Sequence, residues 1–265
     1  MIQAIGLTSV HRPDGLPAVD AVTFEAPQGR VTALFGAPGA GKTTALRLLL
    51  QFDRGHGAAR FRDRPLCRIR NPAQEIGVLL EDLPVHPGRT ARGQLRMLGA
   101  AVGVPAGRAD DVLDVVGLAD FADQRLGGLP TGVTRRLGIA AALLGDPHTL
   151  VLDDPARCLA ERERAWLTAL LRGFAAQGGA VLVTGGDAEW IAEVADQVLT
   201  LEAGRLVAEQ PAGEFGRAQR RRRVAVRSPF AGRLAALLEQ EGRERGRPVA
   251  DRTEPAPGGP AAEGG

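Results

Sequence analysis

The sequence is poor in several residue types, and each shortage excludes a class of protein. Its 265 residues include two cysteines, Cys67 and Cys158, which form no C-x-x-C pair, so a disulfide framework and a cysteine-ligated metal site are excluded. No apolar run approaches the roughly 20 residues that a membrane-spanning helix needs. No secretion signal of the usual kind opens the chain, so we expect an unsecreted protein with reduced thiols.

Lysine is the scarcest charged residue. Arginine supplies 32 of the 33 basic residues, which leaves Lys42 as the single lysine; tyrosine is absent and serine occurs twice. Such a bias suggests a genome that tends to write arginine for lysine. A lysine retained against this bias points to a role that needs its compact ammonium, because the planar guanidinium fits badly inside a tight ring of backbone amides.

Lys42 lies in a glycine-rich loop between a predicted strand and a predicted helix. The loop satisfies G-x-x-x-x-G-K-[ST], the run at 31–35 is typical of a buried strand, and 43–52 is typical of a buried helix. In this context backbone N–H groups surround phosphates, Lys42 reaches the β and γ phosphates, and the Thr43 hydroxyl ligates Mg²⁺. The motif therefore predicts a nucleoside triphosphate site. Its residues are Gly36, Ala37, Pro38, Gly39, Ala40, Gly41, Lys42, Thr43 and Thr44.

A second motif places two acids at the end of an apolar strand. Residues 150–152 are Leu-Val-Leu, and Asp153 and Asp154 follow directly. A metal bound beside a phosphate loop needs a carboxylate, and the carboxyl end of a core strand is where one is expected. We expect Asp153 to hold Mg²⁺ together with Thr43, directly or through water, and Asp154 to polarise the attacking water.

With these motifs in place, three further stretches resemble the ATP-binding subunits of ATP-binding cassette (ABC) transporters, in particular the drug-export-type cassettes of bacteria. Residues 134–147 resemble the helix that joins the family's signature motif to its Walker B strand, 76–80 its Q-loop strand, and 86–90 the entry to its helical subdomain. The resemblance covers residues 2–210. It implies ATPase activity with ATP and Mg²⁺, a dimer that sandwiches ATP, and a membrane-spanning permease as partner at the inner face of the cell membrane.

Two ligand-binding stretches depart from the family pattern. The Q-loop glutamine corresponds to Glu81, which lacks the donor of an amide but keeps a place in the predicted catalytic site. The signature L-S-G-G-Q corresponds to residues 129–133, so that Pro130 replaces the serine. The resemblance leaves Thr131 and Gly132 to bind phosphate at the start of a helix, where proline is tolerated.

Three positions that serve hydrolysis in the family also differ. Asp154 replaces the catalytic glutamate and holds its carboxyl one methylene further back, which weakens the positioning of water. The D-loop aspartate corresponds to Ala160. The switch histidine falls on Thr-Gly-Gly at 184–186, and the four histidines, at 11, 56, 86 and 148, all precede that loop. We therefore expect weak hydrolysis.

The histidines and nearby acids receive separate interpretations. His11 corresponds to the family's adenine-stacking aromatic, although an exposed loop histidine is the simpler alternative. His56, His86 and His148 have no metal-ligand spacing and are expected at the surface. Asp187 and Glu189 are possible substitutes for the switch histidine, but capping of a helix by Asp187 is favoured.

The overall pattern predicts an α/β fold with a mainly parallel sheet, an N-terminal antiparallel β subdomain and an inserted helical subdomain at about 84–146. Strands are expected near 21–26, 31–35, 76–80, 149–153, 180–184 and 197–201, and helices at 94–102 and 110–116. The predicted domains are a cassette at 1–215, a basic appendage at 216–245 and a disordered tail at 246–265. After Pro211 we expect an arginine-rich link, then a strand at 224–226 and a short amphipathic helix.

The basic charge is local. Residues 217–252 contain eleven arginines and four acids, whereas residues 1–216 carry a net charge of −3. The run Arg220–Arg223 suits a solvated linker, and anionic lipid or nucleic acid is the alternative. Nucleic-acid-associated relatives usually join two cassettes, whereas this chain has one P-loop, so no nucleic-acid partner is expected.

Two functions remain open from the sequence. In the first, the chain couples ATP binding and slow hydrolysis to transport through a separate permease, as a homodimer or as one half of a heterodimer. In the second, it is a non-hydrolysing ATP switch, either a regulatory subunit or the degenerate half of a heterodimeric cassette pair, because every altered position lies outside the glycine-rich loop. ATP affinity without turnover would distinguish the second from the first. No motif identifies the cargo or its direction.

Overall fold

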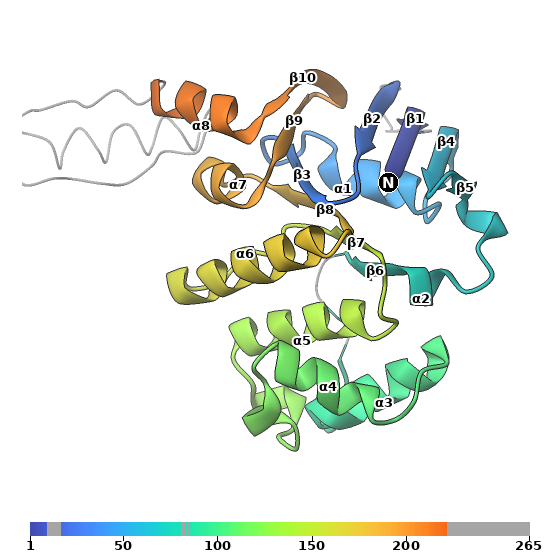
Figure 1. Ribbon diagram of the computed structural model, residues 1–265, viewed down its shortest axis with the longest axis vertical. Helices are drawn as coiled ribbons and strands as arrows, with labels where there is room; N and C mark the ends of the chain where they lie inside the picture. The colour runs from blue at the N-terminus through green and yellow to red at the C-terminus, as the bar shows by residue number, and fades with distance from the viewer. Residues whose placement is uncertain (10–16, 81–82, 84, 222–265) are drawn as a thin grey trace, which may run out of the picture. The chain divides into compact units, whose positions relative to one another are not determined.

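A six-stranded sheet carries both nucleotide motifs. The computed structural model describes residues 1–9, 17–80, 83 and 85–221. The chain divides into two units, Met1–Arg217 and Ala218–Gly265, and the sheet belongs to the first (Figure 1). Its strands are β3 (Arg30–Phe35), β6 (Ile76–Leu79), β7 (Thr149–Leu152), β8 (Ala180–Gly185), β9 (Gln197–Glu202) and β10 (Arg205–Pro211). They lie in the order β10-β9-β3-β8-β7-β6, and only β10 among these six runs antiparallel to its neighbour.

A second, antiparallel sheet is formed by the N-terminal region. It consists of β1 (Ile2–Ser9), β2 (Val22–Ala26), β4 (Gly55–Phe61) and β5 (Arg64–Pro65), in the order β2-β1-β4-β5. Ile2, Ala4 and Leu7 of β1 are buried, which follows the alternation expected of a half-buried strand, with a register shift between Ala4 and Leu7. The predicted antiparallel subdomain is therefore present, and it is larger than the sequence pattern indicated.

Helices surround the two sheets and form the insert. Within the insert, Thr90 begins α3 by accepting a hydrogen bond from the Gly93 N–H at 3.1 Å, and Gly103, with φ of 82°, ends it. The helices are α1 (Lys42–Leu49), α2 (Pro72–Glu75), α3 (Ala91–Val102), α4 (Arg108–Val115), α5 (Thr131–Leu143), α6 (Glu161–Ala176), α7 (Ala188–Val194) and α8 (Ala212–Arg221), with 3₁₀ turns at Leu66–Arg68, Ala119–Phe121 and Leu126–Gly128. Helices α3 to α5 form the predicted helical insert.

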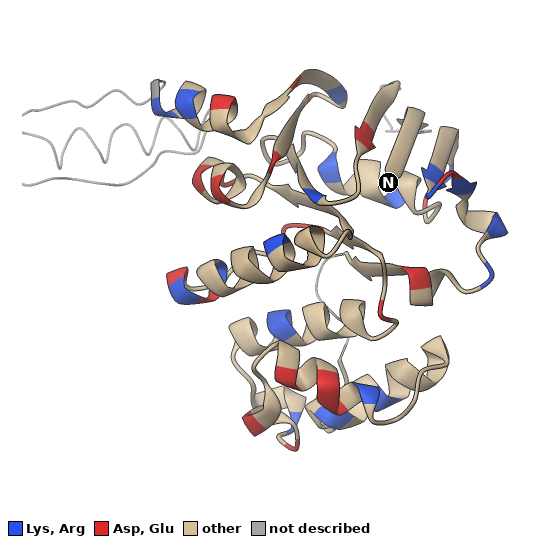
Figure 2. Cartoon of the chain, in the orientation of Figure 1, with Lys and Arg blue, Asp and Glu red and all other residues tan. Residues whose placement is uncertain are grey.

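Ion pairs connect the helices of the insert at its surface. Arg92 on α3 donates to Asp110 on α4 at 2.7 Å and to Asp123 at 2.6 Å, and Arg96 donates to Asp110 at 3.2 Å. Figure 2 shows acidic and basic residues mixed along α3 and α4. The hydrogen bond from Arg92 holds the pKa of Asp110 below its ordinary value. These exposed pairs orient the two helices and leave the energetic work to the apolar core.

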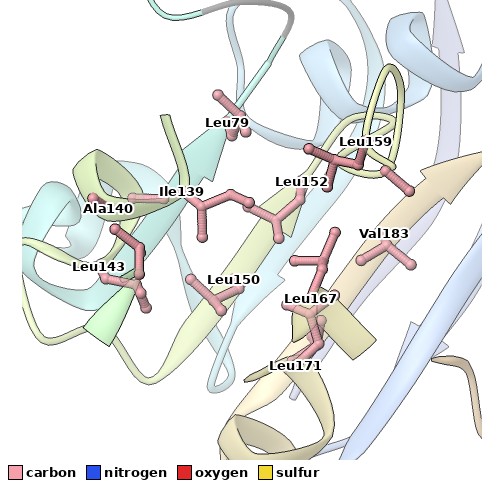
Figure 3. Close-up of a cluster of buried hydrophobic side chains, with 14 of the residues drawn as sticks. Leu79, Ile139, Ala140, Leu143, Leu150, Leu152, Leu159, Leu167, Leu171 and Val183 are labelled. Carbon is pink, nitrogen blue, oxygen red and sulfur yellow. The ribbon is translucent and has the colours of Figure 1, made fainter. Parts of the chain in front are cut away.

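The core has two layers, one on each face of the parallel sheet. Successive residues of β8 alternate between them: Val181 and Val183 face α6, whereas Leu182 faces α1 and the antiparallel sheet. Figure 3 shows the first layer, in which side chains from β6, α5, β7, α6 and β8 converge. Its labelled members are Leu79, Ile139, Ala140, Leu143, Leu150, Leu152, Leu159, Leu167, Leu171 and Val183.

Two expectations about local structure are wrong. The first helix ends at Leu49 instead of Phe52, because Gln51 adopts a left-handed φ of 57° and the Phe52 N–H bonds back to the Arg47 carbonyl at 2.8 Å. The expected link after Pro211 begins instead as helix α8. The predicted strand at 224–226, the following short helix and the tail at 246–265 lie outside the described residues.

One contact between β6 and α5 predicts a large loss of stability. A Cβ at Gly77 would lie 2.1 Å from the Ala142 carbonyl oxygen, so Gly77→Ala must push α5 off the sheet. We expect a loss of about 2–3 kcal/mol in the free energy of unfolding. Gly173 in α6 is the matched control, because nothing lies within 4 Å of its added Cβ, and Gly173→Ala should stabilise by roughly 0.5–1 kcal/mol. Denaturant unfolding measures both, and equal effects of one sign would contradict the packing.

Candidate nucleotide site

The loop between β3 and α1 folds around its own lysine. Lys42 is the first residue of α1, and its Nζ donates to the carbonyl oxygens of Gly36 at 2.7 Å and Ala37 at 3.0 Å. The Ala45 N–H bonds back to the Gly41 carbonyl at 2.8 Å. The N–H groups of residues 42–44 precede this first helical turn and have no acceptor within the helix. The loop thus combines an ammonium with a helix N-terminus, which attracts anions.

Two glycines of the loop leave no room for a side chain. A Cβ at Gly36 would lie 2.4 Å from the Leu201 carbonyl oxygen, and a Cβ at Gly41 would lie 2.4 Å from the Ala18 carbonyl oxygen. Gly41 also has a φ of 103°, which side chains disfavour. The motif's first and third glycines are therefore required by close backbone approach, which fixes the curve of the loop.

The acids after β7 lie beside the loop, as predicted. The Thr43 hydroxyl donates to Asp153 Oδ2 at 2.6 Å, although the two residues are 110 positions apart in the sequence. The Thr184 hydroxyl, at the end of β8, donates to Asp153 Oδ1 and accepts from the Asp154 N–H at 2.9 Å. The Asp153 N–H donates to the Leu79 carbonyl at 2.7 Å. The buried Asp153 is thus fixed from α1, β6 and β8.

Asp154 differs from Asp153 in both backbone and environment. It has a left-handed φ of 43°, a conformation that aspartate tolerates better than most residues. Burial raises the pKa of the Asp154 carboxyl, while the Arg135 guanidinium opposes the rise. Burial lowers the pKa of Lys42, against the attraction of the two aspartates. The site therefore gathers a half-buried ammonium, a buried carboxylate and a half-buried one, where electrostatic interactions are stronger than in bulk water.

These features lie in a region of the chain that a known family model matches. A family model described as ABC transporter matches residues 19–157, which include the loop, Asp153 and Asp154. The chain belongs to the ATP-binding subunits of ABC transporters. This ABC subunit contains, among its described residues, no helix long and apolar enough to cross a membrane.

Known relatives of the ABC subunit include exporter components. The Nod factor export ATP-binding protein I of Burkholderia lata is 32% identical over 197 residues, covering 72% of this chain and 65% of the relative. The daunorubicin/doxorubicin resistance ATP-binding protein DrrA of Streptomyces peucetius is 31% identical over 220 residues, covering 81% and 66%. This chain therefore spans about two thirds of the length of these relatives.

The fold of the ABC subunit also matches solved cassettes. The dimeric structure of an ATP-binding cassette in a post-hydrolysis state, bound to ADP and Pi, aligns with a TM-score of 0.72 and 19% identity, covering 80% of this chain and 99% of that chain. The predicted P-loop α/β fold is confirmed by this likeness and by the sheet order.

The signature region lies in the insert, at the start of α5. Pro130 occupies the N-cap without a side-chain hydrogen bond, and Thr131 is exposed. Gly132 lies against Glu163 of α6, since an added Cβ would be 3.0 Å from both carboxylate oxygens. Glu163 Oε2 in turn accepts from the N–H of Ala160 at 3.0 Å. An acid of α6 therefore lies beside the two signature residues that the resemblance assigns to phosphate.

The loop after β8 has room but no imidazole. A Cβ at Gly186 would be 3.7 Å from the Gly36 carbonyl oxygen, which is ordinary contact. Asp187 caps α7 by accepting from the N–H groups of Glu189 at 3.0 Å and Trp190 at 3.2 Å, and it pairs with Arg164 at 2.5 Å. The capping interpretation of Asp187 is therefore correct.

The remaining sequence predictions have mixed outcomes. His11 and Glu81 lie outside the described residues. His56 and His86 are exposed, but the surface prediction for His148 is wrong. Its side chain is 19% exposed and its Nε2 lies 3.1 Å from Glu75 Oε2, because the His148 N–H also bonds to the Glu75 carbonyl, at the end of α2, at 3.2 Å. That partial burial leaves no sign in the sequence around residue 148.

Sequence reasoning missed the roles of the Thr184 hydroxyl and of the Arg135 side chain at the site. Arg135 is the less expected of the two. It is 4% exposed and donates to the backbone carbonyls of Asp153 and Asp154. A signal was available, because Arg135 shares the helix face of Gly138, Ile139 and Ala142, all of which are buried.

A separate pocket of about 280 Å³ near Leu50 and Val102 has no charged lining residue, so we do not assign phosphate to it.

Proposed function

We propose that the chain binds ATP with Mg²⁺ in the loop at residues 36–44 and uses it to drive export through a separate membrane-spanning permease. The observation that carries the proposal is the Thr43 to Asp153 hydrogen bond of 2.6 Å beside the Lys42 ammonium. It joins an anion-binding loop to a metal-binding acid at one edge of the sheet. Export is supported by the name of the Burkholderia lata relative, the Nod factor export ATP-binding protein I.

The residues present suit Mg²⁺. The Thr43 hydroxyl and the Asp153 carboxylate are hard oxygen donors, which this ion prefers, and both are held by the surrounding elements before any ion binds. In the proposal these two residues hold the ion, which neutralises phosphate charge when bound. Lys42 leaves its two carbonyl partners and turns to the β and γ phosphates.

The other predicted residues take graded roles in the proposal. Asp154 orients the attacking water, and its raised pKa suits it to take up a proton. In the same proposal Glu81 assists hydrolysis, and His11 stacks on adenine. Thr131 and Gly132 bind the phosphate held by a second cassette, in a homodimer or a heterodimer, so that ATP lies between two subunits.

The proposal includes a membrane partner. In it the helical insert, α3 to α5, transmits closure of the dimer to the permease, and the working subunit lies at the inner face of the cell membrane. The basic run Arg220–Arg223 is assigned no role in ATP binding.

A second candidate function is a non-hydrolysing ATP-binding half of a heterodimer. The observation that favours it is Glu163 beside Gly132, because a carboxylate there opposes a second subunit's phosphate. In that case the P-loop still binds ATP, and the partner cassette supplies the competent signature.

Phosphate release from the purified chain tests the proposal. We expect slow Mg²⁺-dependent release that Thr43→Val reduces about tenfold or more, because the methyl group cannot bind the ion. Thr43→Ser is the matched control and keeps the hydroxyl, so it should retain most of the release. ATP binding by calorimetry without release would instead support the non-hydrolysing function, and absence of ATP binding would reject both.

A further inference from the structure

The buried guanidinium of Arg135 is unusual for its position on a helix. Arg135 lies in the second turn of α5 and is 4% exposed, on a helix whose other buried residues are apolar or glycine. Arginine is almost never buried without partners, since an unsatisfied charge is costly in the interior. The partners that the structure gives it include two backbone carbonyls, those of Asp153 at 3.0 Å and of Asp154.

The backbone of Asp153 and Asp154, which accepts these bonds, is held by other elements as well. The Asp153 N–H bonds to β6 through the Leu79 carbonyl, and the Asp154 N–H bonds to β8 through Thr184 Oγ1 at 2.9 Å. The Asp154 carbonyl also accepts from the Arg157 N–H at 3.1 Å, within the turn itself. From the helical insert, the Arg135 side chain also bonds to this turn.

The conformation that results is one that needs support. Asp154 has a left-handed φ of 43°, which costs free energy for a residue with a side chain and persists where the surroundings fix it. A charged donor strengthens its hydrogen bonds to carbonyls relative to a neutral one. The bonds from Arg135 therefore oppose relaxation of this turn toward ordinary backbone.

We propose that Arg135 is a positioning residue that holds Asp154 in its left-handed turn and thereby ties the signature helix to the Asp154 carboxyl. The inference rests on the proposed function only in giving Asp154 a water to orient. Because α5 starts at the signature residues, movement of its first turns acts on Asp154 through the hydrogen bonds of the Arg135 side chain. Arg135 itself contacts no nucleotide in this proposal.

Hydrogen–deuterium exchange of the full chain without nucleotide tests the backbone claim. Arg135→Gln should raise the exchange rate of the amides at 153–154 about tenfold or more, with β3 changed less than twofold, because the turn loosens while the sheet stays folded. Arg135→Lys keeps one charged donor, so its exchange rate at 153–154 should lie between those of the unaltered chain and of Arg135→Gln. Arg136→Gln is the matched control, since Arg136 stacks on Trp166 at 4.4 Å and lies 3.6 Å from Glu163.

ATP turnover supplies a second readout, and it can fail independently of the exchange measurement. Arg135→Gln should lower kcat about tenfold or more while the KM for ATP stays within twofold, with partial rescue by lysine. Unchanged exchange at 153–154, or exchange that rises equally throughout the chain, would overturn the inference. If the unaltered chain releases no phosphate, hydrolysis in the proposed function fails, and the exchange result still decides the role of Arg135.

Discussion

An ATP analogue that carries a pyridoxal aldehyde at its phosphate end will modify Lys42 and no other side chain. The chain has a single lysine, and its Nζ lies at the loop where the phosphates are proposed to bind. Burial lowers the pKa of Lys42, which enlarges the fraction of free amine that forms an imine. Borohydride reduction followed by peptide mass spectrometry should find one adduct, on Lys42, and excess ATP with Mg²⁺ should prevent it.

The same residue should dominate affinity. Lys42→Ala is expected to weaken ATP binding about tenfold to a hundredfold, since hydrogen bonds between charged groups contribute about 1.5–3 kcal/mol. Lys42→Arg is the matched control for charge, and it should bind nearly as poorly because the guanidinium is too broad for the carbonyl pair that now receives Nζ. An adduct that survives excess ATP, or one confined to the α-amino group of Met1, would contradict the site.

Asp154→Asn is expected to lower phosphate release about a hundredfold or more, with ATP affinity unchanged. Asparagine has the same size and also tolerates the left-handed φ of 43°, so only the proton acceptor is lost. The carboxylate form is the active one, and burial raises its pKa. Phosphate release by the unaltered chain should therefore decline as the pH falls, and the midpoint of this decline should lie above the pKa of an ordinary aspartate.

Steady-state release across pH, with calorimetry for affinity, measures this effect. Asp154→Glu is the companion variant, because it keeps the carboxylate and adds the methylene that the family's glutamate has. It should retain release and the acid limb of the profile. Equal release by the asparagine variant and the unaltered chain would remove Asp154 from the reaction.

The loop and the acidic strand end could be predicted because their chemistry is local in sequence. Nine consecutive residues specify the anion-binding loop, and Leu150 to Asp154 specify a strand with its acids. Their meeting, through Thr43 and Asp153, follows from the rule that parallel strands present their carboxyl ends at one edge. The main strands were predictable for a related reason, since buried parallel strands are short apolar runs.

The parts that sequence missed depend on tertiary contacts. Strand β4 reads Gly-His-Gly-Ala-Ala-Arg-Phe, and only Ala59 and Phe61 within it are buried, so it lacks the alternation that marks a strand. Its pairing with β1 supplies what its own side chains do not. The hydrogen bonds of Thr184 and Arg135 to residues 153–154 likewise join positions that no short motif spans.

The two carbonyl partners of Lys42 bear on how nucleotide enters. Because Nζ already occupies the curve of the loop, arrival of phosphate exchanges existing hydrogen bonds for new ones instead of adding bonds to a bare charge. Gly36 and Gly41 fix the curve of the loop, so in the proposed binding mode Lys42 changes its rotamer within a preorganised loop. Association should then proceed at the rate of productive encounters, with only a small heat from the lysine itself.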